Sequence, residues 1–252
     1  MAQVIAFANQ KGGVAKTTSA VSVAAALAEA GRGVLVVDLD PQGALTYSFG
    51  ADPDELSETV NDVLVRRLPV EKVVLEQEVD VVPANIDLAG AEAVLLTKTG
   101  REYALQRALA ALDGTYDYIL IDCPPSLGIL TINGLTAARH VVVPLQCEAL
   151  SHRGVGQLLE TISDIRHFTN AKLTVAGIVP TLYDGRSRHA REVLAAVGER
   201  YGVEVFEPAV RKSIRFAEAA QAGMSILRYA PSHPGAEAYR RIAERIEEAV
   251  TQ

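Results

Sequence analysis

The stretch Asn9-Gln10-Lys11-Gly12-Gly13-Val14-Ala15-Lys16-Thr17-Thr18 decides the fold of this chain. The apolar residues 4–8 before it indicate a buried strand, and the alanine-rich residues 20–30 after it indicate a helix. A glycine loop in that context points its backbone N–H groups inward, and the helix N-terminus adds partial positive charge. The sequence therefore predicts a phosphate-binding loop whose contacts come from Lys11, Gly12, Gly13, Val14, Ala15, Lys16, Thr17 and Thr18.

Two side chains of this loop suit a magnesium nucleotide. Lys16 can reach the terminal phosphates, and the Thr17 hydroxyl can bind Mg²⁺. Gln10 and Ala15 stand where the ordinary Walker A pattern G-x-x-x-x-G-K-[ST] has glycines. If the backbone takes a positive φ at Ala15, alanine costs on the order of 1 kcal/mol there. Because many charge-assisted contacts hold a magnesium nucleotide, we expect the loop to bind one despite Ala15.

Two further apolar runs end in aspartate. Residues 34–37 lead into D-L-D-P-Q-G at residues 38–43, and residues 118–121 lead into Asp122. Asp122 is where a carboxylate would hold a metal-bound water, and Asp38 is the other candidate for the metal shell. Asp40 is the best candidate for orienting a water in line with the γ-phosphate. Alternatively, Asp38 and Asp40 both cap the following turn, and Asp122 caps the turn before Pro124.

The composition is that of an aliphatic, acidic globular protein. The chain has 252 residues, of which 49% are hydrophobic, lacks Trp and carries a formal net charge of −7. Cys123 and Cys147 form no Cys-x-x-Cys pair, so they indicate neither a disulfide framework nor a metal site. No signal peptide is visible, and no apolar run approaches the ~20 residues that span a bilayer. These features favour a cytoplasmic enzyme that does not act on membranes.

Apolar runs alternate with helical patterns along the whole chain. This pattern predicts an α/β fold with a doubly wound, mostly parallel sheet and helices on both faces. The expected strands are residues 4–8, 34–37, 79–82, 118–121, 141–145, 173–179 and 203–206. The expected helices are residues 20–30, 56–66, 87–96, 101–112, 128–138, 151–168, 188–201, 214–222 and 234–250.

Three motifs in order resemble the ParA/Soj family of DNA-partitioning ATPases. They are NQKGGVxKTT from Asn9, VDLDPQG from Val37 and IDCPPSLGxLTxNxL from Ile121. The resemblance extends from about residue 4 to residue 250 and includes Y-D-G-R at residues 183–186 and P-G-A-E-A-Y at residues 234–239. It implies a P-loop NTPase of the deviant Walker A type, formed by residues 1–252 as a single ParA-type domain without an N-terminal helix-turn-helix domain.

The resemblance also implies an activity and its partners. The expected activity is Mg²⁺-dependent ATP hydrolysis, with catalytic roles for Lys11, Lys16 and Asp40. The matching lysine of the family, here Lys11, reaches the phosphates of the partner subunit in an ATP-sandwich homodimer. Such dimers bind the DNA of the nucleoid without sequence specificity. They release it when ATP is hydrolysed, and a ParB-type centromere-binding protein stimulates this hydrolysis. The process served is chromosome or plasmid partition.

Basic residues gather in the later part of the chain. One cluster is Arg186, Arg188, His189 and Arg191, and another is Arg211, Lys212 and Arg215. Either is also compatible with an ordinary helix face paired with glutamates. The resemblance favours Arg186, Arg188, Lys212 and Arg215 as DNA contacts, and it places Arg211 and Lys212 beside the adenine.

Three other classes of P-loop protein compete with this interpretation. A MinD-like positioning ATPase would act on a membrane or another cargo, but the C-terminal helix mixes acidic and basic residues. A reductase component similar to the nitrogenase iron protein would hold an iron–sulfur cluster through cysteines such as Cys123. A small-molecule kinase or ligase would need a substrate pocket.

Overall fold

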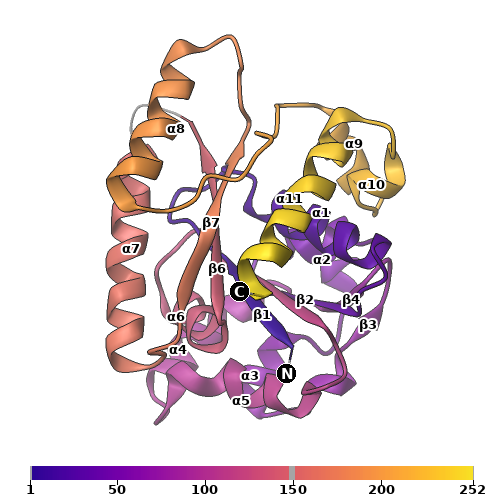
Figure 1. Cartoon of the computed structure of the whole chain (residues 1–252). Helices are drawn as coiled ribbons and strands as arrows, with labels where there is room; N and C mark the ends of the chain where they lie inside the picture. The colour runs from indigo at the N-terminus through magenta and orange to yellow at the C-terminus, as the bar shows by residue number, and fades with distance from the viewer. Residues whose placement is uncertain (1, 148–150, 252) are drawn as a thin grey trace.

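In the computed structural model, residues 2–147 and 151–251 are described, and in them a seven-stranded sheet forms the centre of the molecule (Figure 1). Its strands lie in the order β3-β4-β2-β5-β1-β6-β7. Their bounds are β1 Gln3–Phe7, β2 Val34–Asp38, β3 Leu75–Glu76, β4 Asp80–Val82, β5 Tyr118–Asp122, β6 His140–Gln146 and β7 Thr174–Thr181.

All neighbouring strands are parallel except the pair β3 and β4. The register brings three strand ends together: Asp122 of β5 pairs with Phe7 of β1 on one side and with Asp38 of β2 on the other. The loop that follows β1 and the turn that follows β2 therefore leave the sheet at the same edge. In an open parallel sheet this edge is where ligands bind.

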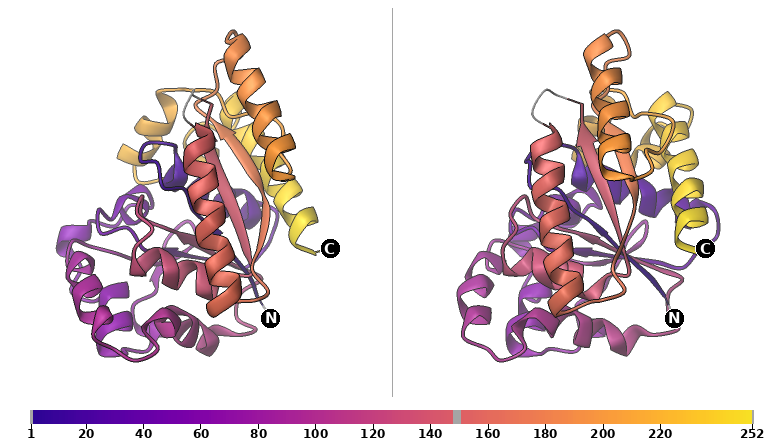
Figure 2. Two further views of the ribbon diagram at one scale, coloured as in Figure 1. Left: turned by 90° about the vertical axis from the view of Figure 1, so that its left-hand side faces the viewer. Right: turned by 60° about the vertical axis from the view of Figure 1, so that its left-hand side comes forward.

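Helices cover both faces of the sheet, as predicted (Figures 1 and 2). On the central strands alternate side chains face opposite ways, so Ile119 and Ile121 of β5 join one hydrophobic cluster and Tyr118 and Leu120 join the other. The first cluster packs under α3 Val60–Arg66, α4 Leu88–Leu96, α5 Ala104–Leu109, α6 Ile129–Ala137 and α7 Ser151–Phe168. The second packs under α1 Lys16–Glu29, α2 Ala44–Ser48, α9 Arg215–Gln221, α10 Ile226–Tyr229 and α11 Pro234–Thr251.

The remaining helix, α8 Arg188–Tyr201, packs against α7 and follows β7. Short 3-10 helices lie at Pro53–Glu55 (η1), Val70–Lys72 (η2), Arg101–Tyr103 (η3) and Ala110–Leu112 (η4). In the part of the chain that the structure describes, no helix is both long and apolar enough to cross a membrane.

The expected strand at residues 203–206 is wrong. Val205 makes only an isolated bridge with Ile178 of β7. In this bridge the Ile178 N–H donates to the carbonyl of Glu204 at 2.8 Å, and the Ile178 carbonyl accepts the N–H of Phe206 at 2.8 Å. Pro208 follows and has no N–H to extend the ladder. The antiparallel strand β3 was not expected, because two residues are too few to show a periodicity.

Candidate nucleotide and metal site

The phosphate-binding loop adopts the backbone that the sequence made plausible. Gly13 has φ 73°, and Ala15 has φ 59° and ψ 38°, so both lie in the left-handed region. The loop is held at two points: Thr181 at the end of β7 donates its hydroxyl to the carbonyl of Val14 at 2.9 Å, and Asn9 accepts the N–H of Lys11 at 3.0 Å. Asn9 also donates to the carbonyl of Pro144 in β6 at 2.8 Å. The loop is therefore fixed to the sheet on the side of β6 and β7.

Lys16 begins helix α1 and is 93% buried, since only 7% of its surface is exposed. Its amine donates to the carbonyl of Lys11 at 3.4 Å, so the side chain folds back over the loop. Burial lowers the pKa of Lys16, while the charges of Asp122 and Asp40 act in the opposite direction. A cation held between the loop and these carboxylates is placed to meet a phosphate.

Thr17 and Asp122 form the closest polar contact of the site. The Thr17 hydroxyl donates to Oδ2 of Asp122 at 2.6 Å, although 105 positions separate the two residues. The other oxygen of Asp122, Oδ1, is buried without a hydrogen-bond partner. Burial, with the charge of Asp38, raises the pKa of Asp122 to about 8. A buried carboxylate oxygen without a donor beside a threonine hydroxyl is the hard oxygen environment that Mg²⁺ prefers, so these residues fit a magnesium ion.

Asp38 lies beside Asp122 but is already occupied by protein donors. Its Oδ1 accepts the N–H of Asp40 at 3.0 Å, and its Oδ2 accepts the N–H of Thr46 at 3.0 Å and the Thr46 hydroxyl at 2.8 Å. Burial raises the pKa of Asp38 to about 6. The carboxylate thus ties the turn after β2 to helix α2. Direct metal binding by Asp38 stays a prediction.

Asp40 takes the turn-capping role that the sequence left open, and its role in hydrolysis stays a prediction. Its Oδ1 caps the turn by accepting the N–H of Gln42 at 3.0 Å. Its side chain is half-buried, and its charge acts on Lys16. The same carboxylate therefore closes the turn and acts electrostatically on Lys16 of the phosphate-binding loop.

The predicted phosphate-bridging residue Lys11 is exposed at the tip of the loop, next to Gly12 and Gly13, which are also exposed. Thr18 is half-buried in the first turn of α1. An exposed loop tip is accessible to a second molecule, which agrees with the role expected of Lys11.

The predicted DNA and adenine contacts lie beyond the end of β7. Arg211 forms an isolated parallel β-bridge with Tyr183, which follows the end of β7 by two residues. The Arg211 guanidinium lies beside Gly185. Arg186 and Lys212 are exposed. Arg215 forms an ion pair of 2.7 Å with Glu218, which offsets its charge. Arg188 begins α8, and its side chain lies outside the described residues.

Three supporting residues were not predicted from the sequence: Asn9, Thr46 and Thr181. Asn9 opens the loop motif, and its type suits a turn, so a signal for it was present. Thr46 and Thr181 carry no local signal, because their partners Asp38 and Val14 are set by the packing of separate elements.

Cys123 does not present a thiolate to a cluster or a substrate. It is fully buried, and its Sγ lies so close to Gly134 that a Cβ added there would be 2.8 Å from the sulfur. Burial also raises the pKa of Cys123. The buried position favours a packing role for this residue.

We predict that Ala15→Gly raises the free energy of unfolding by up to about 1 kcal/mol and leaves nucleotide binding intact, because glycine takes a positive φ without a Cβ penalty. Gly13→Ala is the matched control: a Cβ there meets no heavy atom within 4 Å, so the variant adds only backbone strain. It should destabilise the protein. Urea denaturation and calorimetry with MgATP measure both quantities. Loss of binding in Ala15→Gly would contradict this account of the loop.

We also predict a pH dependence of stability that arises at Asp122. The ordinary pKa of an aspartate is 3.8, and that of Asp122 in the fold is about 8, so between these pH values the folded state holds more protons than the unfolded state. The free energy of unfolding of the metal-free protein should therefore fall as the pH rises through this window. Asp122→Asn should remove much of the decline and be more stable than the parent at pH 8. Asp52→Asn, at an exposed turn, should leave the profile unchanged. The same slope in parent and Asp122→Asn would contradict the assignment.

Comparison with known families places this site in context. A family model described as AAA domain matches residues 2–175. The sporulation initiation inhibitor protein Soj of Bacillus subtilis is 41% identical over 249 residues, which cover 98% of each chain. The chromosome partitioning protein ParA of Caulobacter vibrioides is 40% identical over 249 residues, which cover 97% of this chain and 93% of its own.

Solved structures show the same fold with nucleotide and metal bound. A structure described as cobyrinic acid a,c-diamide synthase from Mycobacterium smegmatis, with an ATP analogue and magnesium, is 52% identical; its TM-score is 0.87, and the match covers 97% of this chain and 93% of that one. The septum site-determining protein MinD from Pyrococcus horikoshii, complexed with Mg-ADP, is 25% identical with a TM-score of 0.77 and coverage of 98% and 97%. The ligands of both structures agree with the predicted cofactors, ATP and Mg²⁺.

Proposed function

We propose that this chain, which belongs to the AAA-domain family and within it to the ParA/Soj ATPases, is a Mg²⁺-dependent ATP hydrolase that drives partition of chromosomal or plasmid DNA. In this proposal two subunits clamp ATP, the dimer binds DNA without sequence preference, and hydrolysis stimulated by a ParB-type partner releases it. The observation that carries the proposal is the Thr17–Asp122 contact of 2.6 Å, which joins the phosphate-binding loop to a carboxylate whose Oδ1 is buried without a partner.

Each residue of the site has a part in this chemistry. The backbone N–H groups of the loop and the N-terminus of α1 receive the phosphates, and Lys16 balances the charge of the terminal one. Thr17 and Asp122 would hold Mg²⁺, and the bound ion would neutralise negative charge on the phosphates. Asp40 orients the attacking water. Lys11 reaches across the dimer to the partner's nucleotide, where a cation is needed between two triphosphates.

The basic residues near the end of β7 support DNA binding as part of the function. Arg211 bridges to Tyr183 and lies beside Gly185, the residue that precedes the exposed Arg186, and a dimer would double this basic segment. Binding to phosphates alone depends on counterion release, so it falls steeply with salt and is insensitive to sequence.

We predict that Arg186→Glu weakens the ATP-dependent binding of random-sequence DNA at least about tenfold at low salt, and that Arg215→Glu has a smaller effect because Glu218 already offsets Arg215. Fluorescence anisotropy of labelled DNA, with MgATP and a salt series, measures both. Arg241→Glu makes the same charge change at an exposed position of α11 and should leave the affinity nearly unchanged. MgATP affinity should be the same in all three variants. Salt-independent DNA binding would contradict the proposal.

A MinD-like positioning role on a membrane is the alternative function, and helix α11 bears on it. The arginines of its polar face form ion pairs: Arg240 with Glu29 at 2.6 Å, Arg241 with Glu237 at 3.1 Å and Arg245 with Glu204 at 2.6 Å. A helix that binds anionic lipid keeps its cations available to the headgroups. The ion pairs of α11 therefore favour DNA binding over membrane binding as the function of this chain. Co-sedimentation with anionic liposomes and MgATP distinguishes the two functions.

The name of the 52% identical structure motivates a second candidate, an ATP-dependent amide synthase. Such an enzyme needs an acid substrate for productive ATP cleavage, whereas a partition ATPase transfers the γ-phosphoryl group to water and needs no organic acceptor. Phosphate release measured with MgATP and DNA but without cobyrinic acid therefore separates the two candidates. Turnover that requires the acid would overturn our proposal.

A further inference from the structure

A cavity of about 570 Å³ lies between helices α3, α4 and α5. Its volume falls within the range of roughly 300–1,000 Å³ typical of small-molecule sites. The wall formed by α5 and η4 leads into the amino end of β5, whereas the loop lies at the carboxyl end of β1. The cavity is therefore separate from the nucleotide site.

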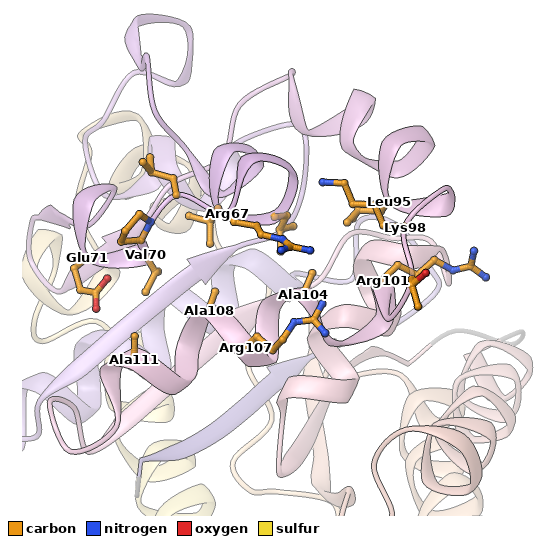
Figure 3. A pocket seen from close by; sticks show the side chains of 15 residues that line it. Arg67, Val70, Glu71, Leu95, Lys98, Arg101, Ala104, Arg107, Ala108 and Ala111 are labelled. Carbon is orange, nitrogen blue, oxygen red and sulfur yellow. The ribbon is translucent and has the colours of Figure 1, made fainter.

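The cavity is basic although the chain as a whole is acidic. Of the described residues that line it, four are cationic, Arg67, Lys98, Arg101 and Arg107, and one is acidic, Glu71. Figure 3 shows the side chains of Arg67 and Arg107 pointing toward one another from opposite walls, with Glu71 at the far end of the cavity. Two guanidinium groups that face each other repel unless an anion lies between them.

Hydrogen bonds hold the cations in place without neutralising them. Arg107 donates to the carbonyl of Gly100 at 2.8 Å, and Lys98 donates to the carbonyl of Val65. Among residues 2–147 and 151–251 no carboxylate lies within ion-pair distance of Arg67, Lys98 or Arg107; only Arg101 has such a partner, Glu102 at 3.0 Å. The positive charge of the cavity therefore stays available to a ligand.

The backbone at Arg67 supports a binding role. Arg67 follows α3 with φ 58°, a left-handed conformation in which a non-glycine residue is strained by on the order of 1 kcal/mol. This conformation ends the helix and leaves the exposed Arg67 side chain over the cavity (Figure 3). Strained residues of this kind are enriched at ligand sites.

The floor of the cavity is aliphatic. It is lined by Leu64, Leu95, Ala104 and Ala108, and none of the described lining residues is aromatic. A nucleobase would find no ring on which to stack, whereas an alkyl chain would bury apolar surface against these side chains. Guanidinium pairs bind phosphate and carboxylate groups through paired hydrogen bonds.

We propose that this cavity binds a small organic anion, with a phosphate or carboxylate group between Arg67 and Arg107 and an aliphatic body on the Leu64–Leu95 floor. Because binding there does not depend on ATP, this proposal can be tested independently of the proposed ATPase function.

Calorimetric titration of the full chain with octyl phosphate tests this proposal. Octanol, which has only the alkyl chain, and inorganic phosphate, which has only the anionic group, are titrated for comparison. We expect octyl phosphate to bind, and octanol and inorganic phosphate each to bind at least tenfold more weakly. Arg67→Gln and Arg107→Gln should each weaken octyl phosphate about tenfold, which corresponds to one charge-assisted hydrogen bond. Ala108→Phe, which fills the floor, should weaken it as well.

Lys172→Gln is the matched control, because it removes one exposed cation elsewhere on the surface, and it should bind octyl phosphate as the parent does. Circular dichroism and MgATP binding verify that each variant is folded. The proposal is overturned if octyl phosphate does not bind, if octanol binds equally well, or if both arginine variants retain the parent affinity.

Discussion

Asp40→Ala should bind MgATP with nearly the parent affinity and hydrolyse it at least about 100-fold more slowly, the usual contribution of a positioned general base. The phosphate contacts expected from the loop, Lys16 and Thr17 do not involve Asp40, so binding is preserved. The carboxylate accepts the N–H of Gln42 through Oδ1, and the backbone N–H of Asp40 donates to Asp38. Single-turnover phosphate release, together with calorimetric MgATP binding, measures the two effects separately.

Two variants test whether this loss is chemical or structural. Asp40→Asn keeps an oxygen for the turn hydrogen bond with Gln42 but removes the charge, and it should be as slow as Asp40→Ala. Asp52→Ala removes an equivalent turn bond, in which Asp52 Oδ1 accepts the N–H of Asp54 at 3.0 Å, outside the phosphate-binding loop. It should hydrolyse ATP at the parent rate. Unchanged hydrolysis in Asp40→Ala would remove Asp40 from the mechanism.

Lys11→Ala should remain monomeric with MgATP under conditions in which the parent becomes a dimer. Lys11 is exposed at the loop tip, while its backbone N–H is fixed by Asn9 at 3.0 Å, so the substitution leaves the loop in place. A symmetric dimer loses two charge-assisted contacts, which weakens association about 100-fold or more. Sedimentation velocity with MgATP in the Asp40→Asn background, where ATP persists, measures the mass of the complex.

Lys172→Ala serves as the control, since it removes an exposed cation before the amino end of β7, whereas the loop follows the carboxyl end of the parallel strand β1, and it should dimerise like the parent. MgATP should bind the Lys11→Ala monomer within a few-fold of the parent affinity, because Lys16 and Thr17 are unchanged. A Lys11→Ala protein that dimerises normally would show that charge bridging by this lysine does not hold the subunits together.

Much of the site was predictable because its residues follow local rules. The loop at residues 9–18 lies between a strand and a helix, and Asp38 and Asp122 end apolar runs. The positive φ that Ala15 adopts was considered from the motif alone. Helices α7 and α8 have the predicted bounds, since their apolar periodicity extends over several turns.

Elements without a local pattern were missed or misassigned. The hydrogen-bonded pairs Thr46–Asp38 and Thr181–Val14 join separate elements, so no local sequence pattern predicts either contact. Residues 203–206 have the composition of a strand, yet Val205 obtains only a bridge to Ile178. Whether a short apolar run becomes a strand depends on the neighbours available to it.

The sequence by itself determined the type of loop, the aspartates at the strand ends and the alternation of strands and helices, because these follow from residue type and short-range periodicity. Only the tertiary structure decided that Thr17 meets Asp122, that Asp38 is taken by Thr46 and that Arg67 and Arg107 face each other across a cavity. Such contacts depend on strand order and helix packing, which bring together groups more than one element apart. The burial of the site residues and the electrostatic interactions between them arise from that packing, so no short stretch of the sequence predicts them.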